Sequence, residues 1–182
     1  MKKTLLSLLA ISMIAVFSNR MMAQTLDTET ANAGAVLIQA MTLTKTVDLH
    51  FGSNVLTTAA GGTVVLPSNS TTREYTGGVA TSPATPVATN AAFDVTGTGL
   101  ETYAVVLPAT TTVTHTSVGT GVNTMTVTNM TARFNGAAAD AVTSALKADG
   151  TDSFTLGGTL TVKAAQVGGI YAGTFDVTVD YN

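Results

Sequence analysis

The side chains best able to do chemistry are few, and they do not form a recognisable site. His50 and His115 each lie among threonine and apolar residues, with no spaced His, Cys or carboxylate partner that would complete a metal set. The run at residues 149–152 (DGTD) contains a carboxylate at each end but lacks the alternating oxygen ligands and closing Glu of a calcium loop. We therefore expect a polar turn there, and no catalytic, cofactor-binding or metal-ligating residue in the chain.

The composition excludes most enzyme classes. Only 10% of the 182 residues are charged, there is no Cys or Trp, and there are two His. Such a chain has few groups for acid–base, thiol or metal chemistry, and no G-x-S-x-G, H-E-x-x-H or phosphate-loop motif is present. The formal net charge of −3, with scattered cations, also disfavours a nucleic-acid partner. We predict a structural or binding protein rather than an enzyme.

The first 23 residues have the pattern of a secretory signal. Lys2 and Lys3 precede an apolar stretch at residues 5–17, which is shorter than the about 20 residues that a membrane span needs. Cleavage after Ala23 would make Gln24 the new N-terminus, and no Cys follows that could carry a lipid anchor. We expect export through the inner membrane to the periplasm, the cell surface or the medium, with no transmembrane span after the signal is removed.

The sequence predicts that the secondary structure of the chain consists mainly of strands. Thr accounts for 36 of 182 residues, and Thr and Val favour strands over helices. The clearest alternation is C-terminal, where one face of a single predicted strand carries the apolar side chains Tyr171, Phe175, Val177, Val179 and Tyr181. Turn residues at short intervals predict one all-β domain, an antiparallel sandwich with an extended N-terminal strand, and a closed barrel is the alternative.

Further strands are predicted at residues 63–66, 73–80, 91–97, 102–107, 111–117, 123–134 and 159–163. One stretch, residues 137–146, is alanine-rich and bracketed by glycines, so we expect two helical turns there at most.

The N-terminal region, residues 33–51, changes its alternation. Val36, Ile38 and Ala40 share one phase, whereas the apolar residues from Met41 onward share the other. A shift of one residue moves every side chain to the opposite face of a strand. Either the strand has a bulge or crosses between its own two sheets, or residues 33–41 form an arm that pairs with a neighbouring subunit. In the second reading Val36, Ile38 and Ala40 are the donor-strand candidates.

Several strand and turn segments resemble the DUF4402 family of bacterial exported proteins, namely residues 41–52 (MTLTKTVDLHFG), 62–67 (GTVVLP), 92–97 (AFDVTG), 102–108 (TYAVVLP) and 159–182. That family is similar to spore-coat-U-like and fimbrial domains. The penultimate Tyr181, and Gly169 fourteen positions from the end, resemble the last strand of chaperone–usher pilins, although the Cys pair of many such pilins is missing. The resemblance implies an immunoglobulin-like fold that assembles by donated strands, with a periplasmic chaperone and an usher as further partners.

We therefore expect a signal at residues 1–23, an N-terminal extension and possible donor strand at 24–44, and a β-sandwich at 45–182. The predicted function is an exported cell-surface structural subunit, pilus- or fimbria-like, that polymerises with itself or related subunits. A monomeric secreted or surface-associated adhesion domain is the alternative.

Overall fold

The computed structural model describes residues 27–81, 85–117 and 119–182 of the chain. The chain divides into two units, Met1–Val36 and Leu37–Asn182. In the first unit, residues 27–36 form neither helix nor strand, and all of them are exposed. The expected export signal, residues 1–23, lies outside the described residues. We call the second unit the body.

The body is built from strands, and its described residues contain no helix. The described strands are β1 (Thr42–Val47), β2 (His50–Phe51), β3 (Val55–Leu66), β4 (Glu74–Thr81), β5 (Ala88–Thr89), β6 (Ala91–Thr96), β7 (Thr102–Val106), β8 (Thr110–His115), β9 (Thr124–Phe134), β10 (Thr143–Ala145), β11 (Thr151–Val162), β12 (Tyr171–Ala172) and β13 (Thr178–Tyr181). The all-β prediction is thereby confirmed.

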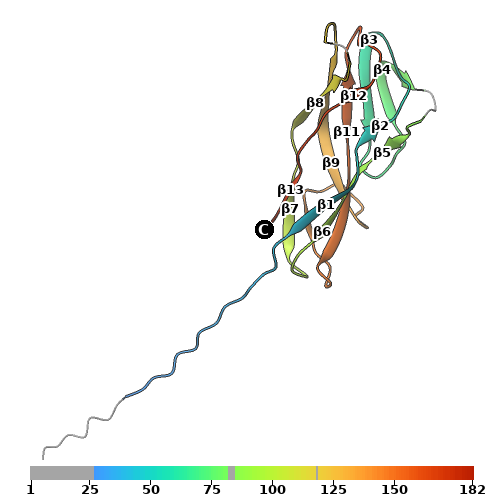
Figure 1. The fold of residues 1–182 in the computed structure, drawn as a ribbon. Coiled ribbons are helices and arrows are strands. Elements are labelled where there is room, and N and C mark those ends of the chain that lie inside the picture. The colour runs from blue at the N-terminus through green and yellow to red at the C-terminus, as the bar shows by residue number, and fades with distance from the viewer. Residues whose placement is uncertain (1–26, 82–84, 118) are drawn as a thin grey trace, which may run out of the picture. The chain divides into compact units, whose positions relative to one another are not determined.

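These strands form antiparallel sheets (Figure 1). The large sheet has the order β1-β6-β11-β9-β8-β12, and β3 pairs with both β11 and β4. A small sheet has the order β10-β7-β13, and β2 pairs with β5. The described end strands β1 and β12 do not pair with each other, so the large sheet is not the closed barrel of the alternative prediction.

The long strand β11 organises the large sheet. Along one edge it pairs with β9, and along the other it pairs first with β6 and then with β3. The change of partner falls at Gly157, where a side chain would place its Cβ 2.2 Å from the carbonyl oxygen of Leu66 and 2.5 Å from the backbone nitrogen of Ser68. Only glycine at this position allows the end of β3 to lie so close to β11. One edge of β11 can therefore pair with β6 and then with β3.

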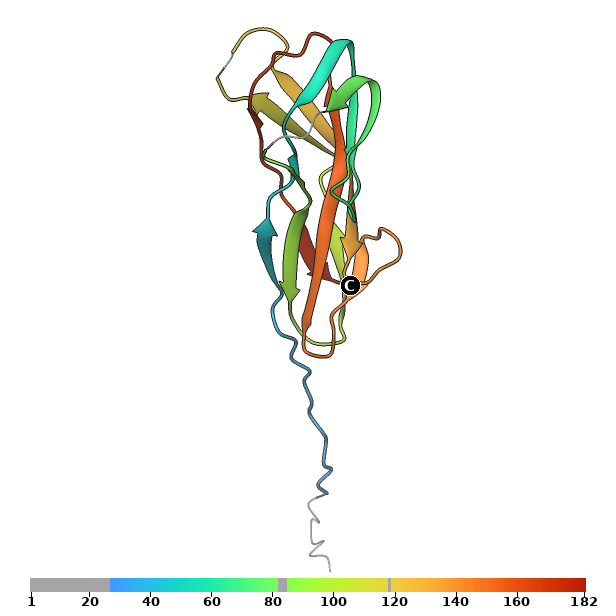
Figure 2. The same ribbon diagram turned by 90° about the vertical axis from the view of Figure 1, so that its right-hand side faces the viewer.

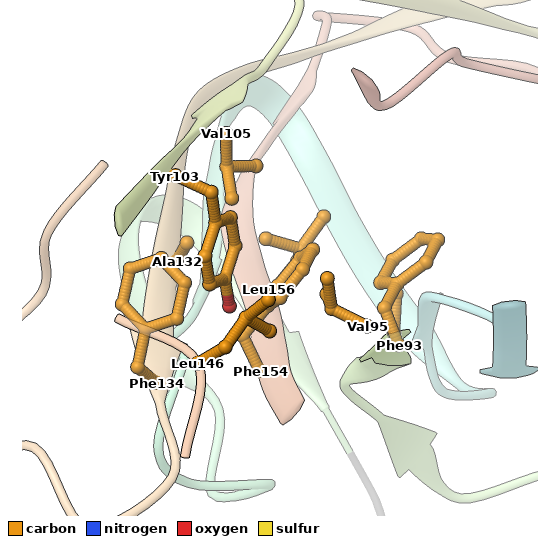
Figure 3. Close-up of a cluster of buried hydrophobic side chains, with 10 residues drawn as sticks. Phe93, Val95, Tyr103, Val105, Ala132, Phe134, Leu146, Phe154 and Leu156 are labelled. Carbon is orange, nitrogen blue, oxygen red and sulfur yellow. The ribbon is translucent and has the colours of Figure 1, made fainter. Parts of the chain in front are cut away.

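The principal core lies between the large and the small sheet. Figure 3 shows Tyr103 and Val105 of β7 among side chains of β6, β9 and β11. The Tyr103 and Phe134 rings meet edge to face with centroids 5.8 Å apart, and Phe154 lies 5.6 Å from Phe134. A second cluster, which includes Val64 and Leu160, fills the region between β3, β9 and β11. Aromatic contacts thus join the two sheets across the first core.

A buried carboxylate also ties the small sheet to the large one. Asp152 of β11 is 7% exposed and accepts hydrogen bonds from Tyr103 Oη (2.9 Å) and Ser144 Oγ (2.7 Å). Its other oxygen accepts the backbone N–H of Ser153 (2.8 Å). Because a buried carboxylate without donors is strongly destabilising, the two donors from Tyr103 and Ser144 make the position of β7 and β10 relative to β11 specific.

The helix predicted at residues 137–146 is wrong. Residues 143–145 form β10, which pairs with β7, and Leu146 is buried in the core. Ahead of them, the guanidinium of Arg133 bonds Asp140 (2.6 Å) and the carbonyl of Ala138 (3.1 Å). Tertiary pairing therefore overrides the helical preference of alanine here.

Each of the other predicted strands overlaps a strand of the structure, and three differences in extent concern β11 and the two ends of the chain. The strand expected at 159–163 is the second half of β11, which begins at Thr151. The single C-terminal strand is divided into β12 and β13, and residues 173–177 between them pair with no described strand. The extended N-terminal strand is also shorter than expected, because β1 begins at Thr42.

We predict that Tyr103→Phe destabilises the body by about 1 kcal/mol at pH 7, because Asp152 then loses one of its donors while still buried. Burial, followed by the bond to Asp152, raises the pKa of Tyr103 above its ordinary value of 10.0. The unfolded chain therefore ionises first, so this contribution is complete below pH 10 and is lost as the pH rises beyond it.

Urea unfolding at pH 7 and at alkaline pH measures both effects. Tyr103→Phe should show a smaller alkaline loss of stability than the wild type. Tyr75→Phe, at a residue that is 36% exposed, is the matched control for the loss of a tyrosine hydroxyl. An unchanged alkaline loss in Tyr103→Phe would contradict the assignment.

Candidate functional site

The chemically capable residues serve as local structural contacts. His50 Nδ1 accepts the backbone N–H of Gly52 (2.8 Å). His115 packs edge-on against Tyr171 and bonds the backbone of Gly168 and Ser117 on its two ring nitrogens. Asp149 accepts both the N–H and the hydroxyl of Thr151, which makes residues 149–151 a polar turn and lowers the pKa of Asp149.

Within the described residues, no group of three or more His, Cys, Asp or Glu side chains could hold a metal ion. In the same part of the chain, no helix has the length and apolar character needed to cross a membrane.

One open hollow lies on the outer face of the large sheet, over β6, β11 and the end of β9. Its volume is about 440 Å³, and its polar lining includes Asn69, Asp94, Arg133, Asn135 and Ser153. Arg133 is already engaged by Asp140 at its edge. Burial acts to raise the pKa of Asp140, but hydrogen bonds from Ser68 and Arg133 outweigh it and lower that pKa. The hollow offers hydrogen-bonding groups without an acid–base pair.

The more distinctive feature is a pair of unpaired strand edges. β1 is the end strand of the large sheet and pairs only with β6, and Figure 2 shows it outermost, with β6 and then β11 beside it. β13 is an end strand of the small sheet and pairs only with β7. Each of these strands therefore presents one row of backbone donors and acceptors that no described strand satisfies.

The apolar side chains beside these two edges are incompletely covered. Met41 and Leu43 on the β1 side pack against the principal core, and so do Phe175, Val177 and Val179 on the C-terminal side. All five are only partly buried, unlike the core residues beneath them. We call this strip, between β1 and residues 173–181, the seam. A strand added at the seam would cover apolar surface and pair open edges at the same time.

Tyr181 closes one end of the seam. Its hydroxyl accepts the backbone N–H of Thr98 (2.7 Å) and donates to the carbonyl of Gln39 (2.7 Å), while the N–H of Gln39 donates to Thr98 Oγ1 (2.6 Å). The last residues of β13 therefore lie beside the start of β1 (Figure 1). A Cβ at Gly97 would lie 2.3 Å from the Tyr181 hydroxyl, so this contact needs glycine. We call it the Tyr181 bridge.

The residues before Gln39 are apolar and exposed. Val36 and Leu37 are each 94% exposed, and Ile38 is 52% exposed. Residues 27–38 have no strand partner within the described chain, and we call them the arm. Residues 35–38 therefore form a run of four exposed apolar residues.

The structure distributes the predicted site residues as follows. Val36 and Ile38 lie on the arm, whereas Ala40 follows Gln39 and so lies beyond the Tyr181 bridge. The C-terminal set is partly buried, and every residue between its members is exposed. The sequence pattern did not reveal the bridge, because nothing in the spacing of Gln39, Thr98 and Tyr181 indicates that they meet.

Comparison with known proteins identifies one family. The model of DUF4402, a domain of unknown function, matches residues 41–181. The match thus covers the body from the start of the seam to Tyr181 and does not include the arm. Neither the curated proteins nor the solved structures contain a match.

We predict that Val177→Asp lowers the free energy of unfolding by about 1–3 kcal/mol, because it places a carboxylate against the apolar core. The neighbouring Thr178 is exposed, so Thr178→Asp should change that free energy by no more than about 0.5 kcal/mol. Urea unfolding of both variants measures the difference. Equal destabilisation would show that the seam face is assigned to the wrong residues.

Proposed function

The chain belongs to the DUF4402 family, and we propose that it is an exported, pilus- or fimbria-like structural subunit that assembles by β-strand complementation. The observation that carries the proposal is the exposed apolar arm ahead of a body with an open apolar seam. In strand complementation, main-chain hydrogen bonds provide affinity, and alternate side chains entering the core set the register.

The proposal explains why both features persist in one chain. An unpaired, partly apolar edge promotes aggregation, and natural proteins normally block it with charge, bulges or covering segments. Here Asp176 and Asp180 are exposed on the C-terminal segment, but the apolar residues between them remain only partly covered. A strand supplied by another copy satisfies the edge without leaving it open to unspecific pairing.

We interpret the two sheets and their shared core as an immunoglobulin-like sandwich that lacks one edge strand. The aromatic and aliphatic side chains of the principal core come from both sheets, as the inner faces of a sandwich require. The seam lies where a further strand would join β1 and β13. The donated arm then completes a fold that one chain builds only in part.

Assembly of this kind belongs outside the inner membrane. Lys2, Lys3 and the apolar residues 5–17 support export, which places the subunit in the periplasm, at the cell surface or in the medium. Its partners are then further copies or related subunits. A periplasmic chaperone would cover the seam before assembly, and an usher would mediate it.

The hollow on the large sheet supports a second candidate, a monomeric adhesion domain. Its neutral amides, hydroxyl and carboxylate suit a polyhydroxyl ligand such as a sugar. This candidate leaves the exposed arm without a role, so we rank it below strand complementation.

For export, we predict a mature protein that starts near Gln24 and carries no lipid, since no Cys is available for acylation. Mass spectrometry of the envelope and secreted fractions measures the N-terminus and the mass. An intact Met1 or a lipid adduct would contradict this prediction.

For assembly, we predict that the mature chain forms oligomers that persist in mild denaturant, because a whole strand of ladder bonds must release together. Deletion of residues 24–38 keeps Gln39 and the Tyr181 bridge, so it should give a folded monomer. A synthetic peptide of residues 28–38 should then bind this monomer and raise its melting temperature by linkage.

Size-exclusion chromatography with light scattering compares the full and truncated chains, and calorimetry measures the peptide effect. A peptide with the same composition in scrambled order is the control. A full-length chain that stays monomeric at high concentration, or a truncated chain that still polymerises, would rule out strand complementation.

A further inference from the structure

The inference here rests on the proposed function and concerns which face of the arm enters the partner. Successive side chains of a strand point to opposite sides, so only one of two sets can face the partner's core. One set contains Thr30, Asn32, Gly34, Val36 and Ile38, of which two are polar and one is glycine. The other set is apolar without interruption and contains Ala31, Ala33, Ala35 and Leu37.

The Tyr181 bridge defines where the free part of the arm ends. Both backbone groups of Gln39 are engaged by the body, the N–H by Thr98 Oγ1 and the carbonyl by the Tyr181 hydroxyl. Ile38 is 52% exposed, whereas Leu37 is 94% exposed, so the side chain of Ile38 already packs partly on its own body. Leu37 is therefore the last residue whose side chain is fully available to another molecule.

The alternation also continues through this boundary. Leu37, Met41 and Leu43 have the same parity, and Met41 and Leu43 pack against the core of their own body. Gln39 is the single polar residue of that series, and it lies at the bridge. Apart from Gln39, one face of the chain is thus apolar from Ala31 to Leu43, and after the bridge this face is directed at its own core.

The seam suits small side chains. Phe175, Val177, Val179 and Tyr181 border it at intervals of two residues and are already partly buried. Alanine is the apolar residue that covers partly buried side chains with the least risk of overpacking. Four arm residues at intervals of two match four seam residues at the same interval.

We propose that Ala31, Ala33, Ala35 and Leu37 of a second copy face the seam, with Val36 and Ile38 outward. The donated strand runs antiparallel to residues 173–181, so that Leu37 lies nearest Phe175 and Ala31 nearest Tyr181. This specifies the partner as the arm of another copy and names its specificity-determining residues.

The direction follows from the proposed open polymer together with the place of the bridge. The arm leaves the body at the end that carries Tyr181. In a donated strand that runs antiparallel to β13, the last arm residue lies at the end of the acceptor opposite its Tyr181. The Tyr181 end of the donor therefore contacts that opposite end of the acceptor. That contact is heterologous and repeats into an open chain. A parallel strand would bring two Tyr181 ends together and close the assembly as a pair.

Two charge substitutions in the full-length chain test the face. Leu37 and Val36 are equally exposed at 94%, so neither Leu37→Asp nor Val36→Asp should change the melting of the body. Leu37→Asp should abolish assembly, because it would bury an unpaired carboxylate in the acceptor. Val36→Asp should leave long chains of wild-type size, measured by light scattering after size exclusion.

A cysteine pair tests the register, because the natural chain contains no Cys. In the proposed register Val36 lies opposite Asp176, and both point outward. A mixture of Val36→Cys and Asp176→Cys chains should form an intermolecular disulfide under mild oxidation. Val36→Cys with Phe175→Cys is the control for the other face and should not form one.

Each outcome has one reading. The proposed face would be overturned if Val36→Asp lost assembly, with or without Leu37→Asp, or if both variants still assembled. A disulfide in the control pair would overturn it as well. Closed dimers of the wild type would overturn the antiparallel direction. Those results leave strand complementation itself standing, whereas a wild-type chain that does not assemble removes both the proposed function and this inference.

Discussion

The arrangement of the body depends on how the small sheet is held against the large one. β13 has a single strand partner, β7, and β7 is positioned by Tyr103 through its ring contact with Phe134 and its hydroxyl bond to Asp152. A carboxylate in this position is stable only while its donors remain in place. The wall of the seam that β13 provides therefore depends on a polar contact in the middle of an apolar core. Such contacts are costly to bury, and their benefit is a unique relative placement of two sheets that hydrophobic packing alone would leave free to slide.

The seam exists because the strands that border the principal core do not cover all of its apolar side chains. The principal core is closed where β6, β9, β11 and β7 surround it, and it is only partly covered where β1 and residues 173–177 border it. Burial of apolar surface is worth roughly 25 cal/mol per Å², so a strand laid along this strip gains hydrophobic as well as hydrogen-bond free energy. The arm has the length to provide it, since its residues 27–38 span about 40 Å when extended. In the proposed assembly, the arm of one copy completes the body of the next.

Much of the fold was predictable from alternation, because a strand with one wet face repeats its pattern every two residues. The partly buried and exposed residues of the C-terminal segment alternate as the sequence indicates, even where residues 173–177 lack a strand partner. Prediction failed where tertiary pairing decided the local structure. The alanine-rich stretch at 137–146 became β10 and a buried Leu146. The first half of β11 escaped notice because Asp152, a buried carboxylate, interrupts its apolar pattern, and only the donors from β7 and β10 explain why it lies inside.

Tertiary contacts that the sequence does not reveal also decide the candidate site, and they change how the alternation in the N-terminal region is interpreted. Read from Val36, Ile38 and Ala40, the sequence shifts phase before β1; read from Leu37 and Met41, it does not shift. Periodicity cannot choose between these readings, because residues 35–38 are apolar on both faces. The choice requires knowing that Gln39 is held by Tyr181 and Thr98, two residues far away in sequence. A slip of one residue would turn every side chain of a donated strand to the wrong face. In the proposed assembly, a bridge that stops the body's own strand at one residue therefore gives the arm of every copy the same end point and phase, which is the condition for identical contacts along a polymer.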